Sequence, residues 1–120
     1  MRRSRPQQVE FELKAKLFRG LADPSRLVLL EALRGGPSTV SELVKRTGLT
    51  QPNASMHLDC LHCCGLVERE RSGRFVRYRI RAPRVRQLLA AGDRALEEVK
   101  SQVSACERYD VAGRRRRVAR

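Results

Sequence analysis

Apolar and polar residues follow two different periods along this chain. Up to residue 64 the apolar positions recur every three or four residues, which is the period of an amphipathic α-helix. This period predicts four helices, over residues 9–21, 24–34, 40–47 and 51–64. The predicted buried positions are Leu27, Leu30, Ala32 and Leu33 in the second helix, Val40, Leu43 and Val44 in the third, and Ala54, Leu58 and Leu61 in the fourth.

Short polar residues and glycines stand where these helices should begin and end. A side-chain oxygen just before a helix can accept from its free amides, and a glycine after it can adopt a left-handed conformation. The candidate caps are Asp23 before Pro24, Ser38 or Thr39 with Glu42 as in a capping box, and Thr50, and the candidate stops are Gly48 and Gly65. A short helix, a glycine-containing turn and a second helix with a polar start form a helix-turn-helix.

After Gly65 the period changes to two, as in a β-strand. Two alternating runs surround Ser72-Gly73, which predicts a β-hairpin. Pro83 then opens a last helix over residues 84–103, whose long apolar stripe has little to cover within one chain. The fold class expected is mainly α with a small β-hairpin wing (α+β), a winged helix-turn-helix that forms a homodimer through its first and last helices.

Length and charge narrow the class of partner. The chain has 120 residues, enough for one small domain, and a net charge of +13. This charge favours nucleic acid over a membrane surface, although it could also serve only to keep the protein dispersed. No apolar run could span a bilayer or serve as a signal peptide, so we expect a cytoplasmic protein. The expected organisation is a disordered basic segment at 1–8, a DNA-binding and dimerisation domain at 9–105, and a C-terminal segment with a basic tail at 106–120.

Two groups of residues are candidates for contact with double-stranded DNA. The fourth helix begins with side chains that lie off its apolar stripe, where a recognition helix reads base edges. These candidates are Gln51, Asn53, Ser55 and His57. Arginines of the hairpin would lie along phosphates, as a wing does. The candidates there are Arg71, Arg74 and Arg77, whereas a solvated strand face explains Arg69, Arg79 and Arg81 equally well.

Three of the four cysteines lie within a single five-residue segment, 60–64, of the fourth helix. Cys60 and Cys64 are one turn apart, so their thiols project side by side. Thiolates are soft ligands, and a site of three thiolates suits cadmium, lead or mercury better than zinc, which prefers four ligands. This pattern therefore predicts a site for a thiophilic metal ion, with Cys63 as a surface thiol or a spare ligand.

The same cysteines could serve in three other ways. Cys60 and Cys64 could pack as small apolar residues at the base of the wing. One of the helix cysteines could instead form a disulfide with Cys106, which would make the chain a thiol/disulfide redox-sensing repressor of the same fold. A thiol enzyme is not expected, because no acid–base partner beyond two helix histidines and no glycine-rich cofactor loop is present.

Two segments, ADPSR at 22–26 and SELVKRTGLTQPNASMHLDCLHCCGLVERERSGRFVRYRI at 41–80, resemble the ArsR/SmtB family of dimeric winged-helix repressors. The resemblance covers about residues 9–105. It implies a repressor that binds operator DNA as a dimer and is released by a metal ion. The run SMHLDCLHCCG is most similar to cadmium- and lead-sensing members of the family. That similarity implies a site formed by Cys60, Cys64 and, from the partner subunit, Cys106, and it gives Cys63 no counterpart.

Overall fold

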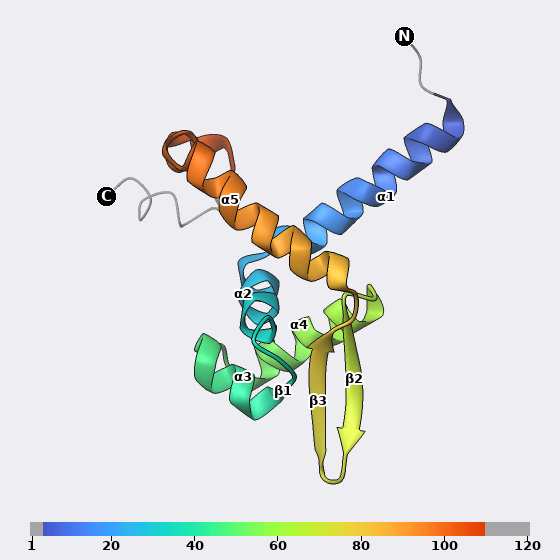
Figure 1. The fold of residues 1–120 in the computed structure, drawn as a ribbon, viewed down its shortest axis with the longest axis vertical. Coiled ribbons are helices and arrows are strands. Elements are labelled where there is room, and N and C mark those ends of the chain that lie inside the picture. The colour runs from blue at the N-terminus through green and yellow to red at the C-terminus, as the bar shows by residue number, and fades with distance from the viewer. Residues whose placement is uncertain (1–3, 110–120) are drawn as a thin grey trace. The chain divides into compact units, whose positions relative to one another are not determined.

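A computed structural model describes residues 4–109 (Figure 1). The elements in order are α1 (Arg5–Ala22), α2 (Pro24–Leu33), β1 (Ser38–Thr39), α3 (Val40–Thr47), α4 (Gln51–Cys63), β2 (Val67–Ser72), β3 (Phe75–Ile80), α5 (Pro83–Ala105) and the 3₁₀ turn η1 (Glu107–Tyr109). The chain divides within α5, between Arg86 and Gln87, into two compact units. The expected basic tail at 114–120 lies outside the described residues.

Helix α1 begins earlier than the sequence analysis predicts. It starts at Arg5, so residues 5–8 are helical, which corrects the expectation that the whole segment 1–8 is disordered. The cause is local: the amide of Ser4 donates to Oε1 of Gln7 at 3.0 Å, and the amide of Gln8 donates to the Ser4 carbonyl at 3.0 Å. Pro6 adds to this start, because proline is tolerated in the first turn of a helix.

The predicted boundaries of α3 and the predicted start of α4 are confirmed, while α4 ends at Cys63, one residue earlier than predicted. Thr39 Oγ1 accepts from the Glu42 amide at 3.2 Å, and Glu42 Oε1 accepts from the Thr39 amide at 2.9 Å, which completes a capping box. Thr50 caps α4 through its hydroxyl. Gly48 and Gly65 follow α3 and α4 with φ of 76° and 77°, the left-handed conformation that favours glycine.

One small core joins α2, α3, α4 and the base of the hairpin. The side chains that build it are Leu29, Leu30, Leu33, Leu43, Ala54, Leu58, Leu61, Leu66, Val67, Tyr78 and Ile80, all of them buried. The prediction for Leu27 was wrong, because Leu27 is 37% exposed and Leu29 is buried in its place. The positions Ala32, Val40 and Val44 are half-buried and lie at the edge of the core. From Leu27 to Leu33 only Glu31 is polar, so the sequence period does not distinguish one face of this segment from another.

The sheet has three antiparallel strands in the order β1-β3-β2. The hairpin is confirmed: Ser72 pairs with Phe75 around a two-residue turn in which Gly73 has φ of 61°. Strand β1 was not predicted. Its two residues pair with Tyr78 and Arg77 of β3, and they lie immediately before α3. Strand β1 therefore joins the start of the helix-turn-helix to the wing, Val67–Ile80.

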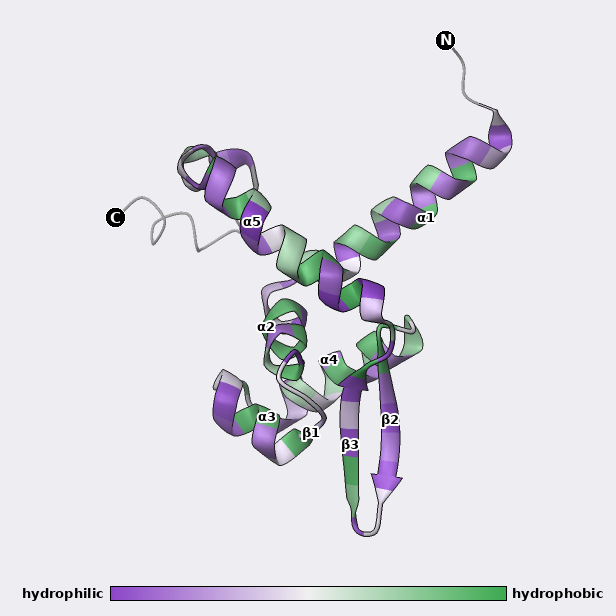
Figure 2. Cartoon of the chain, in the orientation of Figure 1, coloured by the Kyte–Doolittle hydropathy of each residue, from purple (hydrophilic) through white to green (hydrophobic). Residues whose placement is uncertain are grey.

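Both units carry exposed apolar side chains along helices. In the first unit these are Val9, Phe11, Leu13, Leu17 and Phe18 on α1, with Leu27 and Val28 on α2. In the second unit Leu96, Val99 and Val103 form a stripe along α5. Figure 2 shows the hydrophobic segments that recur along α1. Within residues 4–109, the structure contains no helix with the length and hydropathy of a membrane span.

Candidate nucleic-acid interface and cysteine site

Helix α4 buries one face and presents the opposite one. Ala54 and Leu58 lie in the core, whereas Met56, about half a turn away from them, is 57% exposed. Gln51 and Asn53 are exposed in the first turn, and Ser55 is half-buried. The first two turns of α4 therefore present amide, hydroxyl and thioether side chains, which can hydrogen-bond base edges or pack on thymine methyl groups.

His57 differs from the other candidate base-contacting residues. Its Nδ1 atom lies 4.0 Å from Oδ2 of Asp23, and only 16% of its side chain is exposed. Asp23 caps α2 by accepting from the Arg26 amide at 3.0 Å. Partial burial raises the pKa of Asp23, but the Arg26 amide and the charges of Arg26 and His57 outweigh it, so this pKa lies below its usual value. His57 thus lies beside the residue that caps α2, and its contact with DNA stays a prediction.

The strand register divides the charged side chains of the wing between two faces. Arg69 and Arg71 share a face with Tyr78, while Arg77 and Arg79 share the other with Glu68 and Glu70. Arg79 lies 3.5 Å from Glu68 and 3.7 Å from Glu70, so the second face is close to neutral. Arg77 lies directly opposite Glu70 in the register.

The net positive charge of the wing is therefore concentrated at its tip. Arg71 and Arg74 are exposed, and neither has an acidic partner within 4.0 Å among residues 4–109. Arg69 instead lies 3.5 Å from Asp59 of α4, an exposed pair between the wing and the helix. Of the three arginines expected to contact phosphate, Arg71 and Arg74 are placed best for it.

Cys60 and Cys64 lie on successive turns at the end of α4. The amide of Cys64 donates to the carbonyl of Cys60 at 3.0 Å, and both thiols are free and exposed. Nη1 of Arg26 lies 3.9 Å from Sγ of Cys60. The same guanidinium donates from Nε to the Gly20 carbonyl at 2.9 Å, near the end of α1. Cys60 is therefore adjacent to the junction of α1 and α2, a contact that sequence spacing does not reveal.

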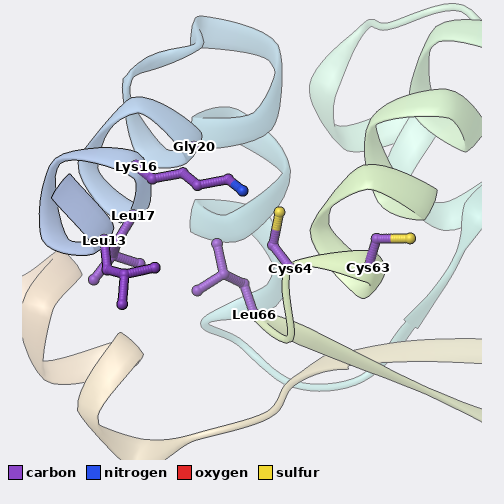
Figure 3. Close-up of a pocket in the computed structure, with 7 residues that line it drawn as sticks. All are labelled: Leu13, Lys16, Leu17, Gly20, Cys63, Cys64 and Leu66. Atoms are coloured by element: carbon purple, nitrogen blue, oxygen red, sulfur yellow. The ribbon is translucent and has the colours of Figure 1, made fainter. Parts of the chain in front are cut away.

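Cys63 and Cys64 are neighbours in sequence but point in different directions. Figure 3 shows the Cys64 sulfur directed toward α1 and the Cys63 sulfur directed away from it. The space between α1 and the end of α4 is an open hollow of about 320 Å³, and Cys64 forms part of its wall. The hollow is lined by Leu13, Lys16, Leu17, Gly20, Cys63, Cys64 and Leu66.

Cys106 belongs to the second unit. It follows α5 directly, is half-buried and free, and its amide donates to the Gln102 carbonyl at 3.0 Å. Among residues 4–109 of one chain, no three His, Cys, Asp or Glu side chains are grouped so that they could hold a metal ion. Cys60 and Cys64 do fit two soft ligands of such a site, because both thiols are exposed and their residues are one helical turn apart.

Comparison with known proteins gives consistent matches. The family model described as bacterial regulatory protein, arsR family, matches residues 23–69. A "Probable mercury resistance operon repressor" of Streptomyces lividans is 37% identical over 102 residues, which cover 85% of this chain and 82% of that protein. The regulator CmtR of Mycobacterium bovis is 48% identical over 64 residues, 53% of this chain and 54% of CmtR.

A solved structure matches the fold as well. The homodimeric winged helix-turn-helix DNA-binding domain of a Mycobacterium bovis protein has a TM-score of 0.72 at 30% identity and covers 82% of this chain and 91% of that one. The matched family and relatives are DNA-binding transcriptional regulators, not enzymes, and the helix-turn-helix and wing of this chain are consistent with that class. The chain belongs to the ArsR family of bacterial regulatory proteins.

Proposed function

We propose that this protein is a metal-responsive repressor that binds operator DNA as a homodimer and is released by a thiophilic ion. Cadmium, lead and mercury are the candidate ions, and zinc is less favoured. One observation carries the proposal: α4 presents a polar surface at its start and two accessible thiols one turn apart at its end. Because a helix is stiff over this length, an ion that moved the end of α4 would also move its start.

Exposed apolar side chains support the dimer. Phe11 and Phe18 on α1 are 47% and 49% exposed, and Leu96 and Val99 on α5 are 46% and 45% exposed. Large apolar groups that recur at helical spacing mark interaction surfaces. The Mycobacterium bovis neighbour is itself homodimeric. A twofold dimer would place two copies of α4 in successive major grooves, about 34 Å apart on a palindromic site.

Cys60 and Cys64 would hold the ion, and Cys106 of the partner subunit would supply a third thiolate. Soft thiolates give the selectivity for soft ions. The names of two relatives, a mercury resistance operon repressor and CmtR, agree with an effector of this class. Arg26 contacts both Cys60 and the last turn of α1. Movement of the Cys60 thiol would therefore also displace Arg26 and change its contact with α1.

The test is a titration of reduced protein, bound to a fluorescent operator, with cadmium, lead, mercury, zinc and arsenite in parallel. Wild-type protein should leave DNA with a thiophilic ion. Cys60→Ser and Cys64→Ser should keep DNA binding without metal and lose the release. Cys63→Ser is the matched control and should respond like wild type. Release that persists in the Cys60→Ser/Cys64→Ser double variant would exclude the proposed site.

The redox-sensing alternative remains, because all the cysteines are free thiols and three of them are exposed. It predicts release by an oxidant such as a disulfide and no metal uptake in reducing buffer. A thiolate-to-metal charge-transfer band that grows with stoichiometric metal in reducing buffer favours the metal response instead.

A further inference from the structure

The tip of the wing carries an aromatic side chain that the fold leaves uncovered. Phe75, the first residue of β3, is 58% exposed. Its register partner is Ser72, whose small hydroxyl side chain offers no apolar surface to pack against. Figure 2 shows this end of β3 as a hydrophobic segment next to the turn, and Figure 1 shows the turn projecting beyond α3 and α4. Single exposed apolar residues are common, so the surroundings of Phe75 decide what it indicates.

Phe75 lies between two arginines, Arg71 and Arg74, whose guanidinium groups have no carboxylate within 4.0 Å in the described part of the chain. Gly73 has φ of 61° and Arg74 has no positive φ, which is the pattern of a narrow type II′ turn. Because side chains alternate between the faces of a strand, Arg71 lies on one face of the wing and Phe75 on the other, with Arg74 in the turn. An apolar group between two cations matches DNA, whose phosphates border grooves lined by sugars and bases.

The length of the wing determines which groove its tip can reach. Strands β2 and β3 have six residues each, so at ~3.4 Å per residue the wing is about 20 Å long. The major groove that α4 would occupy is only ~12 Å wide. The pair of Arg69 with Asp59, 3.5 Å apart, holds the wing beside α4. A wing held there would extend past the phosphate backbone, and its tip would reach the neighbouring minor groove.

We propose that Phe75 enters the minor groove beside each half of the operator and wedges into a base step, while Arg71 and Arg74 contact the flanking phosphates. The inference deepens the proposed function, because it rests on binding of operator DNA by a dimer and adds a source of sequence preference outside the α4 contacts. Apolar side chains inserted from the minor groove partially unstack a base step and kink the duplex. The energy of that distortion depends on the sequence, since pyrimidine–purine steps such as TA unstack easily and A-tracts are stiff.

Two flanks made only of A·T pairs distinguish a wedge from readout by arginine. Alternating TA and uniform A present the same acceptors in the minor groove, so hydrogen bonds there do not tell them apart. A-tracts narrow the minor groove and attract arginine, so readout by Arg74 would favour the uniform flank. A wedge favours the alternating flank, because TA steps open most easily. The two mechanisms therefore predict opposite preferences.

The experiment measures binding of the reduced, metal-free full-length protein to two duplexes at one fixed salt concentration. Both contain the palindromic core that the wild-type protein selects from random DNA, and they differ only in about eight flanking base pairs on each side, alternating TA or uniform A. Fluorescence anisotropy gives the affinities, and 2-aminopurine in place of a flanking adenine brightens when its base unstacks. Wild type should bind the alternating flank about tenfold more tightly, and the 2-aminopurine should brighten.

Two substitutions of Phe75 separate the wedge from a structural role. Phe75→Ala should lose the preference and the 2-aminopurine signal, whereas Phe75→Leu should keep both in part, because leucine also serves as a wedge. The matched control, Arg71→Gln/Arg74→Gln, should weaken binding to both duplexes by the same factor and keep the preference. The side chain of Phe75 is mostly exposed, so its removal should leave thermal unfolding and the dimer unchanged.

A wild-type protein without preference for the alternating flank overturns the inference, as does a preference that Phe75→Ala retains. Preference for the uniform flank overturns it in favour of arginine readout, and loss of the dimer in Phe75→Ala would place the phenyl ring between two copies of the chain instead. If cadmium releases the operator but Phe75→Ala behaves like wild type, only the wedge is refuted. If the wedge is found and no ion releases the DNA, the metal response alone fails. If the protein selects no DNA from the random pool, operator binding and the wedge fail together.

Discussion

Removal of Arg71 and Arg74 should reduce the salt dependence of DNA binding by a predictable amount. The change is Arg71→Gln/Arg74→Gln, which removes the two arginines at the wing tip that lack an acidic partner among residues 4–109. A dimer would lose four phosphate contacts. Because each contact contributes ~0.9 to the slope of log affinity against log salt, the slope should fall by about 3.6. Between 50 and 200 mM salt this is about a hundredfold difference in affinity loss.

The assay is fluorescence anisotropy of the dimer on operator and on random DNA across a salt series. The control is Glu70→Gln/Arg79→Gln, which removes a pair 3.7 Å apart and leaves the charge of the wing unchanged. The double arginine variant should lose affinity for both DNAs alike, and the control should keep its slope. If Glu70→Gln/Arg79→Gln lowers the salt slope as much as Arg71→Gln/Arg74→Gln does, pairing with Glu68 and Glu70 does not keep Arg79 from contacting phosphate.

Three further predictions concern the site, the capping of α2 and the reading of bases. When Cys60→Ser/Cys64→Ser subunits are mixed with Cys106→Ser subunits, each heterodimer should regain about one tight metal site. The Cys106→Ser chain keeps Cys60 and Cys64, and the other chain keeps Cys106. If metal binding is not recovered, all the ligands lie in one chain. The lowered pKa of Asp23 means that its negative charge stabilises the fold fully above a pH of about 4 and progressively less as the pH falls through that lowered pKa. In urea unfolding, the difference in free energy of unfolding between wild type and Asp23→Asn should therefore shrink from pH 7 to pH 3. Met56→Ala should weaken operator binding about fourfold, which corresponds to ~0.8 kcal/mol for one buried methyl-sized group. If Met56 packs on a thymine methyl group, deoxyuridine in place of that thymine should not weaken the binding of the variant any further. Losses that add up would show that Met56 touches no methyl group.

Features set by neighbouring residues were predictable from the sequence. The capping box of Thr39 and Glu42 lies within four residues, and Gly65 marks the end of α4 by its own conformational preference. The buried face of α4 follows from the spacing of Ala54, Leu58 and Leu61, because polar residues separate them. These local signals were enough to predict the order of the helices and the hairpin.

Features that depend on distant segments were not predictable. Strand β1 has only two residues, too few for any period, and it exists because β3 lies beside it. The approach of His57 to Asp23, the residue that caps α2, joins positions 34 residues apart, and no spacing within α4 indicates it. The hollow beside Cys64 needs α1 and α4 to meet, and no spacing within either helix predicts that meeting.

The pairing of β1 with β3 has a consequence for protein engineering. Ser38 and Thr39 are part of the sheet, yet Thr39 is also the residue that caps α3. A chimaera that exchanges residues 67–80 with the wing of a relative would keep the old β1 against a new β3. Ser38 is fully buried and accepts from Nη1 of Arg46 at 3.1 Å, so a poor fit there would reach the helix-turn-helix directly. A transplanted wing should therefore bring its own equivalents of residues 38, 39 and 46 with it.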